Sequence, residues 1–395
     1  MAEDHRIWGL SLAHLLTDFY SPILSAVLPL LILTHGFSYM TAGLLVTIFN
    51  LTSSVTQPFF GWFSDRRGKG IPVPVSLAIS AVFIGLIGIA PDFMLIALCA
   101  GLGAIGHAIF HPSAMGAAGT LCTNQNRGRL MSYFVIGGNL GYALGPLFAG
   151  IAVELFGLPG ILILAIPGLL MAVLGKRFLP DTRERCTGPL NSGSRKQRIG
   201  RKAAVGMGIL VCAAGLRAWV IFASIAYLPA LFVMRGFDLW MANLFVTLML
   251  LAGVAGQVIG GTLSDRYGRK EYTIAGMLLA IPPFWIFLSS DGILSMMALF
   301  VFGFFLWSTF AVSVAIAHEL LPGNIGLASG LVLGLAIGGG GIGVAITGSM
   351  ADAIGLVPAL HALVAPITAS ILLFVLLPYP WRLLWQRNTS FQAKS

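Results

Sequence analysis

Long apolar segments, separated by short polar stretches, run along the whole chain. Segments such as residues 73–90 and 204–216 stay apolar over many consecutive positions, without the alternation typical of a membrane-barrel strand. A helix needs about 20 apolar residues to cross a bilayer. The pattern therefore predicts twelve transmembrane helices, near residues 7–33, 41–63, 71–90, 93–118, 129–153, 158–178, 204–233, 239–263, 271–290, 293–317, 325–350 and 357–378.

The composition agrees with a chain embedded in a lipid bilayer. Of its 395 residues, 57% are apolar and 9% are charged, and the mean hydropathy is +0.91. A soluble domain carries about 25% charged residues, so this chain lacks the polar surface that a water-soluble protein needs. The same composition excludes an intrinsically disordered chain. We expect an all-α integral membrane protein.

The second half of the chain repeats the first at an offset of 200 residues. The stretch 57–68 recurs as 257–268, with Gln, Gly, Ser, Asp and Arg at shared positions. Repeated sets of spans are typical of secondary transporters. The sequence therefore predicts two pseudo-symmetric six-helix halves. The predicted parts are residues 1–178 and 204–378 for the halves, 179–203 for a basic linker, and 379–395 for a tail.

Positive charges are distributed by topology. Nearly all Lys and Arg residues fall in the termini, the linker and the loops on one side of the predicted spans. By the positive-inside rule, that side is cytoplasmic. We expect a multi-pass protein of the inner (plasma) membrane with both termini in the cytoplasm. The formal charge of +9 therefore does not indicate a nucleic-acid partner.

The repeated loop carries a family resemblance. Gly61-x-x-x-Asp65-Arg66-x-Gly68 follows the second predicted span, and its counterpart, with Asp265 and Arg266, follows the eighth. This pattern resembles the signature loop of the major facilitator superfamily. The resemblance implies alternating access and a central cavity lined by spans one, four, seven and ten.

Within that superfamily, the chain is most similar to the fosmidomycin resistance protein family of drug exporters. The stretches that carry this similarity are His14-Leu-Leu-Thr-Asp18, Phe110-His111-Pro112, residues 135–147 around Gly138-Asn139, and Glu319-Leu-Leu-Pro-Gly323. The resemblance implies a proton antiporter that exports small amphiphilic or anionic compounds such as antibiotics. It implies a small-molecule substrate and protons as partners, and the proton gradient in place of a cofactor.

Other functions stay open at this point. A proton-coupled importer of an organic anion fits the same fold, as does an exporter of metals or siderophores. A sensor or channel would not need the repeated Asp loops. No Walker loop, nucleophile elbow or metalloprotease helix is present, so an enzyme is not expected. We expect a monomer.

Ionisable residues within the spans are the candidate transport site. They are costly in a membrane and mark pathways or proton relays. His14 and Asp18 lie one turn apart on one helix face. Arg217 is the repeat equivalent of Thr17, so we expect Arg217 and Asp18 to face one cavity. Arginine stays protonated, which leaves Asp18 as the proton carrier.

Further candidates lie in spans four, five and ten. His111 carries the resemblance and is expected to contact substrate, whereas its neighbour His107 is either packed or hydrogen-bonded. Asn139, His318 and Glu319 complete the set for substrate and proton coupling. His and Asp side chains together can also ligate a transition metal. Because no Cys or further carboxylate lies at this depth, we predict no metal and no catalytic residue.

A last group of residues is expected to act as gates. Charge contacts at the ends of helices can form in one state and break in the other, and glycines with a proline make a smooth, bent face. The predicted gating residues are Asp65, Arg66, Gly68, Asp265, Arg266, Arg269, Gly141, Gly145 and Pro146.

Overall fold

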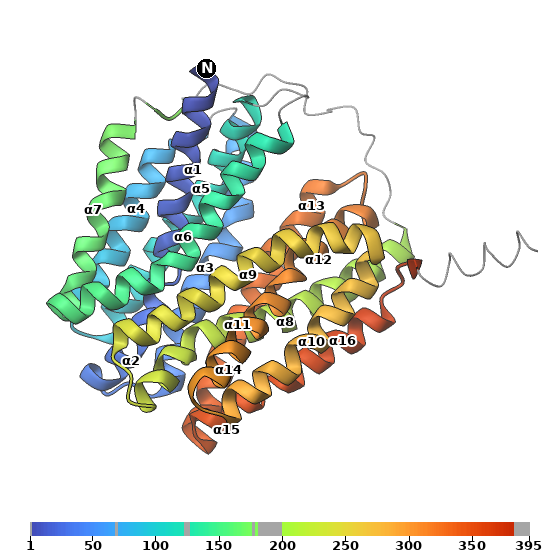
Figure 1. The fold of residues 1–395 in the computed structure, drawn as a ribbon. Coiled ribbons are helices and arrows are strands. Elements are labelled where there is room, and N and C mark those ends of the chain that lie inside the picture. Colours follow the sequence, from blue (N-terminus) through green and yellow to red (C-terminus); the bar gives the residue numbers. More distant parts are fainter. Residues whose placement is uncertain (1, 68–69, 122–126, 176–177, 181–199, 383–395) are drawn as a thin grey trace, which may run out of the picture. The chain divides into compact units, whose positions relative to one another are not determined.

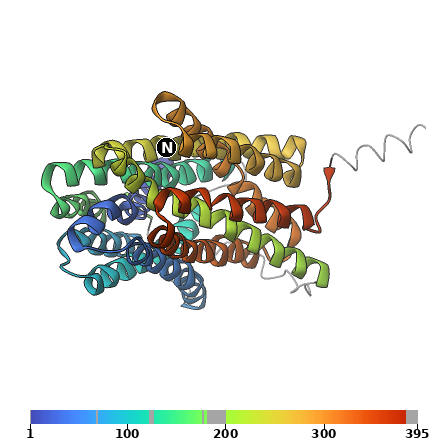
Figure 2. The same cartoon turned by 90° about the horizontal axis from the view of Figure 1, so that it is seen from below.

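The computed structural model describes residues 2–67, 70–121, 127–175, 178–180 and 200–382, and this part of the chain is almost entirely helical (Figures 1 and 2). The helices are α1 (Ala2–Tyr20), α2 (Ile23–His35), α3 (Tyr39–Arg67), α4 (Val73–Leu86), η1 (Ile87–Ile89), α5 (Phe93–Leu121), α6 (Arg127–Phe156), η2 (Leu158–Gly160), α7 (Ile161–Leu174), α8 (Arg201–Met234), α9 (Leu239–Tyr267), α10 (Arg269–Ser289), α11 (Gly292–Ser308), α12 (Phe310–Leu320), α13 (Ile325–Ser329), the π-helical turn η4 (Gly330–Leu335), α14 (Ala336–Ile354), α15 (Leu356–His361) and α16 (Val364–Leu376).

Each predicted span corresponds to a helix or a run of helices, which confirms the all-helical membrane fold. Within the described residues, nine helical segments are long and apolar enough to cross a membrane. The shorter apolar helices Val73–Ile89 and Leu158–Leu174 match two more predicted spans. The more polar α3 matches the predicted span 41–63.

In the described part of the chain, three predicted spans are interrupted: the span over 357–378 breaks between α15 and α16, and two others break near the middle. The span predicted over 7–33 is broken between α1 and α2 at Ser21 and Pro22. Proline has no N–H to continue the helical bonding, so a new helix begins after it. The span predicted over 293–317 is broken at Thr309, between α11 and α12.

Packing divides the chain into two compact units. Unit 1 combines Met1–Leu190, Ala223–Thr247 and Val344–Leu356, and unit 2 combines Asn191–Phe222, Leu248–Gly343 and Val357–Ser395. These units do not follow the sequence halves 1–178 and 204–378, which stay a prediction.

In unit 1, glycines of α6 allow a close approach of α1, and the two helices pack side by side (Figure 1). The glycines are four residues apart and form one stripe along α6. A side chain at any of them would collide with the α1 backbone. The facing pairs are Gly137 with Ser11, Gly141 with Leu15, and Gly145 with Phe19. The α1 helix, which carries His14 and Asp18, is thereby fixed against α6.

Polar side chains fix two other helices of unit 1. The hydroxyl of Tyr20 on α1 donates to the carbonyl of Leu164 and accepts from the amide of Gly168, both at 3.0 Å, which ties α1 to α7. The Asp352 carboxylate accepts from the amides of Tyr39 and Met40 at 2.8 and 2.9 Å. This caps the start of α3, where a negative charge complements the helix dipole.

In unit 2, α10 packs against α11, α12 and α16. The buried amine of Lys270 donates to the carbonyls of Val375 and Leu377, at 3.0 and 2.8 Å, and so satisfies the end of α16. Glycines again allow a neighbouring helix to pack closely: Gly340 and Gly343 of α14 lie against Ala218 and Trp219 of α8. Arg217 lies on this part of α8.

Candidate functional site

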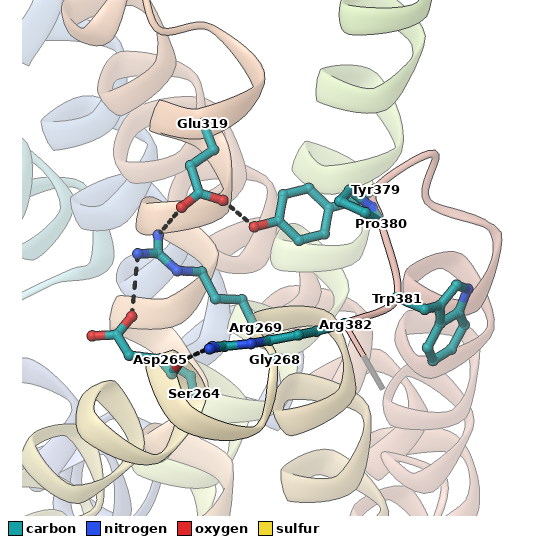
Figure 3. A pocket seen from close by; sticks show the side chains of 9 residues that line it. All are labelled: Ser264, Asp265, Gly268, Arg269, Glu319, Tyr379, Pro380, Trp381 and Arg382. Atoms are coloured by element: carbon teal, nitrogen blue, oxygen red, sulfur yellow. Dashed lines mark hydrogen bonds and ion pairs between the residues drawn. The ribbon is translucent and has the colours of Figure 1, made fainter. Parts of the chain in front are cut away.

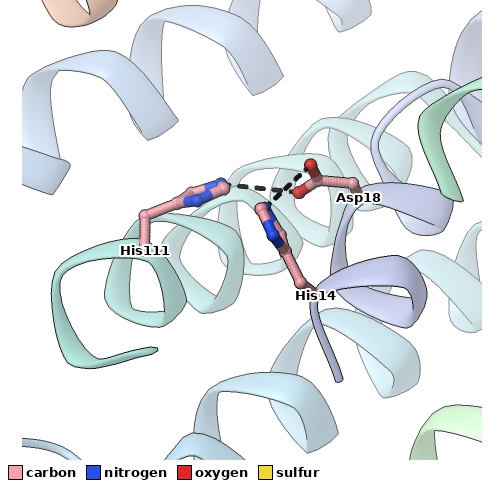
Figure 4. Close-up of side chains that lie close together, drawn as sticks. All are labelled: His14, Asp18 and His111. Atoms are coloured by element: carbon pink, nitrogen blue, oxygen red, sulfur yellow. Dashed lines mark ion pairs between the residues drawn. The ribbon is translucent and has the colours of Figure 1, made fainter. Parts of the chain in front are cut away.

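One carboxylate and three imidazoles of unit 1 form a compact cluster, and Figure 4 shows three of its members, His14, Asp18 and His111. Asp18 Oδ2 lies 3.2 Å from His14 Nε2 on the same helix. Its Oδ1 lies 3.4 Å from His107 Nε2 and 3.5 Å from His111 Nε2, both on α5. We call these four side chains the Asp18 cluster. The structure thus brings three predicted site residues together and adds His107 to them.

Neighbouring groups hold the rings of the cluster in place. His14 Nδ1 donates to the Phe134 carbonyl at 2.7 Å, and the ring stacks on Phe134 with centroids 4.2 Å apart. Since a carbonyl only accepts, Nδ1 carries the hydrogen of a neutral His14 ring. His107 Nδ1 lies 2.9 Å from the Ser53 hydroxyl. A side chain at Gly138 would collide with His14 and Asp18, so glycine at this position leaves room for the cluster.

The Asp18 cluster has the chemistry of a proton relay. Imidazoles both donate and accept protons near physiological pH, and a carboxylate accepts them. Asp18 Oδ1 is buried and has no hydrogen-bond partner among the described residues. A buried carboxylate is tolerated when groups of this kind surround it.

Arg217 on α8 is a buried cation in unit 2. Its side chain is 2% exposed, and Nη1 donates to the hydroxyls of Thr309 and Ser313, both at 3.0 Å. The guanidinium carbon lies 5.4 Å from the centre of the Phe310 ring. Among the described residues of unit 2, no carboxylate lies within ion-pair distance, and Nε has no hydrogen-bond partner. Within the described part of unit 2, Arg217 is therefore hydrogen-bonded to neutral groups.

The break between α11 and α12 explains how these partners reach Arg217. Thr309 is the residue between the two helices, and Ser313 lies near the start of α12. The last turn of α11 also presents the negative end of its dipole to this region. The arrangement favours a cation and leaves donor capacity for an anion. The predicted pair between Arg217 and Asp18 stays a prediction, since each side chain finds other partners within its own unit.

A second charged network in unit 2 is centred on Arg269, at the start of α10 (Figure 3). The guanidinium lies 3.2 Å from Asp265 Oδ1 and 3.0 Å from Glu319 Oε1. The Tyr379 hydroxyl donates to Glu319, and Arg382 donates to the Asp265 carbonyl. These residues border a pocket of about 290 Å³. The network joins α9, α10 and α12 to the segment after α16.

This network contains two of the predicted gating residues and one residue predicted to couple protons. Asp265 and Arg269 meet as a charge pair, and Glu319 joins them rather than the Asp18 cluster. Burial and the hydrogen bond to Glu319 raise the pKa of Tyr379, so its phenol stays protonated and continues to donate. The carboxylate of Asp265 is 68% exposed, which limits the strength of the pair.

The other predicted residues lie apart from these sites. His318 Nε2 lies 2.7 Å from the Ser329 hydroxyl. Asn139 is half-buried on α6 and is not part of the Asp18 cluster. Arg66 stacks over Trp62, and Arg266 over Tyr267. Gly141 and Gly145 receive α1, and Pro146 lies within α6. The side chain of Asp65 and all of Gly68 lie outside the described residues.

Several important residues carry no distinctive signal in the sequence. Thr309 and Ser313 are common hydroxyl residues in an apolar span, and only the packing of α8 beside the helix break shows their role. Tyr379 follows the last span without a motif. Gly138 could have been singled out, since it belongs to the glycine-rich stretch that carries the family resemblance.

A match to a family model establishes the family of this chain. The model of the Major Facilitator Superfamily matches residues 10–244 and 210–390, which together span nearly the whole chain. The chain belongs to the major facilitator superfamily. Its all-helical fold and its sequence resemblance agree, and this membership makes it a membrane transporter and not an enzyme.

Relatives of this superfamily transporter include drug-resistance proteins. An uncharacterised MFS-type transporter of Bacillus subtilis, YfnC, is 33% identical over 383 residues, covering 93% of this chain and 91% of the relative. The fosmidomycin resistance protein of Escherichia coli is 31% identical over 360 residues, covering 87% and 86%. The multidrug resistance protein MdtG of Citrobacter koseri is 26% identical, covering 62% of each chain.

A solved structure with a similar fold is a bacterial homologue of the human lysosomal transporter Spinster, in an inward-facing and occupied conformation. The TM-score is 0.78 at 17% identity, covering 94% of this chain and 95% of the other. This likeness supports the major facilitator fold.

Proposed function

We propose that this transporter is a proton antiporter that exports small amphiphilic or anionic compounds by alternating access. It would lie in the inner (plasma) membrane with both termini in the cytoplasm, where the positive-inside rule places them. The observation that carries the proposal is the buried Arg217, whose charge is met by hydroxyls only within its unit. A guanidinium binds carboxylate, phosphate or phosphonate groups in bidentate fashion.

The energetic reason for an anionic substrate is the cost of the buried cation. An uncompensated arginine at the centre of a membrane costs at least about 2.5–3.5 kcal/mol. An anionic group on the substrate would remove part of that cost, and the free Nε of Arg217 offers a further donor. The aromatic ring of Phe310 beside the guanidinium would accept the apolar part of an amphiphilic compound.

Proton coupling is assigned to the Asp18 cluster. Arginine cannot release its proton, whereas a carboxylate with three imidazoles around it can exchange one. Protonation of Asp18 from the outside would weaken substrate binding, and substrate from the cytoplasm would favour loss of the proton. Such antagonism is reciprocal at equilibrium. Alternation of the two binding events would then exchange substrate for protons.

The direction of transport rests on the relatives. The fosmidomycin resistance protein and MdtG carry names that connect them with resistance, which favours export over import. The test is a susceptibility panel in cells that lack their main efflux pumps and express either wild-type protein or the Arg217→Ala variant. We expect resistance to at least one anionic antibiotic with wild type, and none with the variant at equal membrane abundance.

Two results would overturn this proposal. Increased sensitivity to anionic compounds, together with greater uptake, would identify an importer. Resistance that is confined to cations or neutral compounds and unaffected by Arg217→Ala would exclude an anion site at this arginine.

A further inference from the structure

We propose that the Asp18 cluster is a binding site for a divalent transition-metal ion such as Zn²⁺. The sequence alone favours a site without metal, because no Cys or further carboxylate lies at this depth. Folding brings His107 and His111 of α5 to the same carboxylate. Three imidazoles and one carboxylate are a donor set that zinc prefers.

The spacing of three of the four donor residues fits one ion, and His107 lies beside them. The donor atoms of His14, Asp18 and His111 all lie within 4.8 Å of one another. The contacts from Asp18 to the imidazoles measure 3.2–3.5 Å, and His107 Nε2 lies 3.2 Å from His111 Nε2. With bonds of about 2.0–2.1 Å, two ligands of a tetrahedral zinc ion lie about 3.3–3.4 Å apart. A metal could therefore bind with small side-chain movements.

The orientation of His14 also matches a metal ligand. Its Nδ1 donates to the Phe134 carbonyl, so the lone pair of the neutral ring lies on Nε2, the atom that faces Asp18. Metal-binding histidines commonly donate their other ring N–H to a carbonyl in this way, which fixes the ring and its tautomer. The Ser53 hydroxyl lies 2.9 Å from His107 Nδ1 and holds that ring in place as well, and a hydroxyl can accept from Nδ1 when Nε2 binds the metal.

The contact between His107 and His111 is a further indication. Two Nε2 atoms at 3.2 Å share one hydrogen, since two facing N–H groups or two facing lone pairs would repel each other. The buried Asp18 Oδ1 has no hydrogen-bond partner among the described residues, although both rings lie near it. A divalent cation that replaced the shared hydrogen would be bound by the carboxylate and by both Nε2 atoms at once, with release of one proton, and would join α1 to α5.

This inference goes beyond the proposed function: Zn²⁺ and protons would compete for Asp18, so proton coupling would belong to the metal-free form. Metal binding is measured without substrate or a pH gradient, so it can fail independently of transport. The full chain is purified in detergent with an affinity tag that contains no histidine. Zn²⁺ binding is measured by calorimetry and by metal analysis after dialysis. We expect about one Zn²⁺ ion to bind per chain, with a Kd of about 1 μM or lower.

Variants locate the bound ion. His111→Gln and Asp18→Asn each remove a ligand and should weaken Zn²⁺ binding by at least about 10-fold, the lower limit for loss of a supporting group. His361→Gln, which alters a histidine packed against Trp285 in unit 2, is the matched control and should leave the affinity unchanged. Size-exclusion profiles identify any variant that fails to fold. If one ligand variant fails, the affinity of the other ligand variant for Zn²⁺ tests the proposed site.

Co²⁺ provides a second readout that depends on geometry. Co²⁺ in a tetrahedral site of nitrogen and oxygen ligands absorbs visible light much more strongly than octahedral Co²⁺. We expect this absorption in wild type and in His361→Gln, and its loss in the ligand variants. Absence of stoichiometric Zn²⁺ in the wild type, or equal affinity in wild type and the folded ligand variants, would overturn the proposal.

Discussion

The Asp18 cluster and the Arg217 site hold opposite charges within membrane spans by different means. Asp18 is surrounded by imidazoles, which can exchange protons with it. Arg217 is surrounded by the hydroxyls of Thr309 and Ser313, which hydrogen-bond but do not titrate. In the proposed function this difference is a division of tasks: the carboxylate side would change its charge during the cycle, whereas the cationic side would keep a permanent charge for the substrate.

The largest effect is expected from Arg217→Ala. Loss of the charge and of its bidentate donors should weaken binding of an anionic substrate about 100-fold, or about 2.7 kcal/mol. Asp18→Asn mimics the protonated carboxyl but keeps the guanidinium, so it should weaken the same affinity less, by about 10-fold, and should remove its pH dependence. Equilibrium binding to purified protein measures both. Equal losses in the two variants would contradict the division of tasks.

The double variant Thr309→Val, Ser313→Ala tests the hydroxyls and keeps the charge. Hydrogen bonds to charged groups contribute about 1.5–3 kcal/mol, and their loss should leave the guanidinium mobile and lower substrate affinity about 10- to 30-fold. Thr368→Val, which removes a hydroxyl on α16 that bonds only within its own helix turn, is the control. Unchanged affinity in the double variant would show that the hydroxyls do not orient Arg217.

Gly138→Ala tests the Asp18 cluster instead of the Arg217 site. Its new methyl group would lie about 2.6 Å from Asp18 Oδ2 and must displace the cluster. Overpacking of this kind costs about 1–3 kcal/mol, so proton-driven transport should fall about 10-fold while substrate affinity stays unchanged. Gly339→Ala, where the new methyl group has no neighbour within 4 Å, should transport at the wild-type rate. A transport rate in Gly138→Ala equal to that of Gly339→Ala would contradict this role of the cluster.

The smallest effect is expected from Asp265→Asn, which touches neither site. The pair with Arg269 is largely exposed at Asp265 and is worth at most about 1 kcal/mol. Its loss should shift the balance between inward-open and outward-open states by no more than about 5-fold. Cysteine accessibility from each side of the membrane measures the shift. A larger shift would give this contact a greater gating role than its exposure allows.

The sequence predicts the spans and part of the Asp18 cluster for clear physical reasons. Hydrophobic length determines the helices, and the four-residue spacing of His14 and Asp18 places them on one helix face. The break at Pro22 was missed because proline is often tolerated inside transmembrane helices. His107 could not be assigned to the cluster, since its contact with Asp18 depends on how α5 packs beside α1.

For the Arg217 site, the sequence predicts the charged residue but none of its partners. The sequence identifies the arginine at once, because a charge in an apolar span is rare. It does not identify the partners, since neither the break at Thr309 nor the position of Ser313 has a marker in the sequence. Isolated charges are therefore predictable from the sequence, whereas the neutral groups that hold them require the packed structure.

Transport in proteoliposomes with an imposed pH gradient tests the central claim most directly. Wild-type protein, with one side acidified, should accumulate an anionic substrate against its concentration gradient on the acidic side, and collapse of the pH gradient should abolish the accumulation. Asp18→Asn should still exchange substrate down its gradient but should not accumulate it. Accumulation by Asp18→Asn, or wild-type transport that ignores the pH gradient, would contradict proton coupling through Asp18.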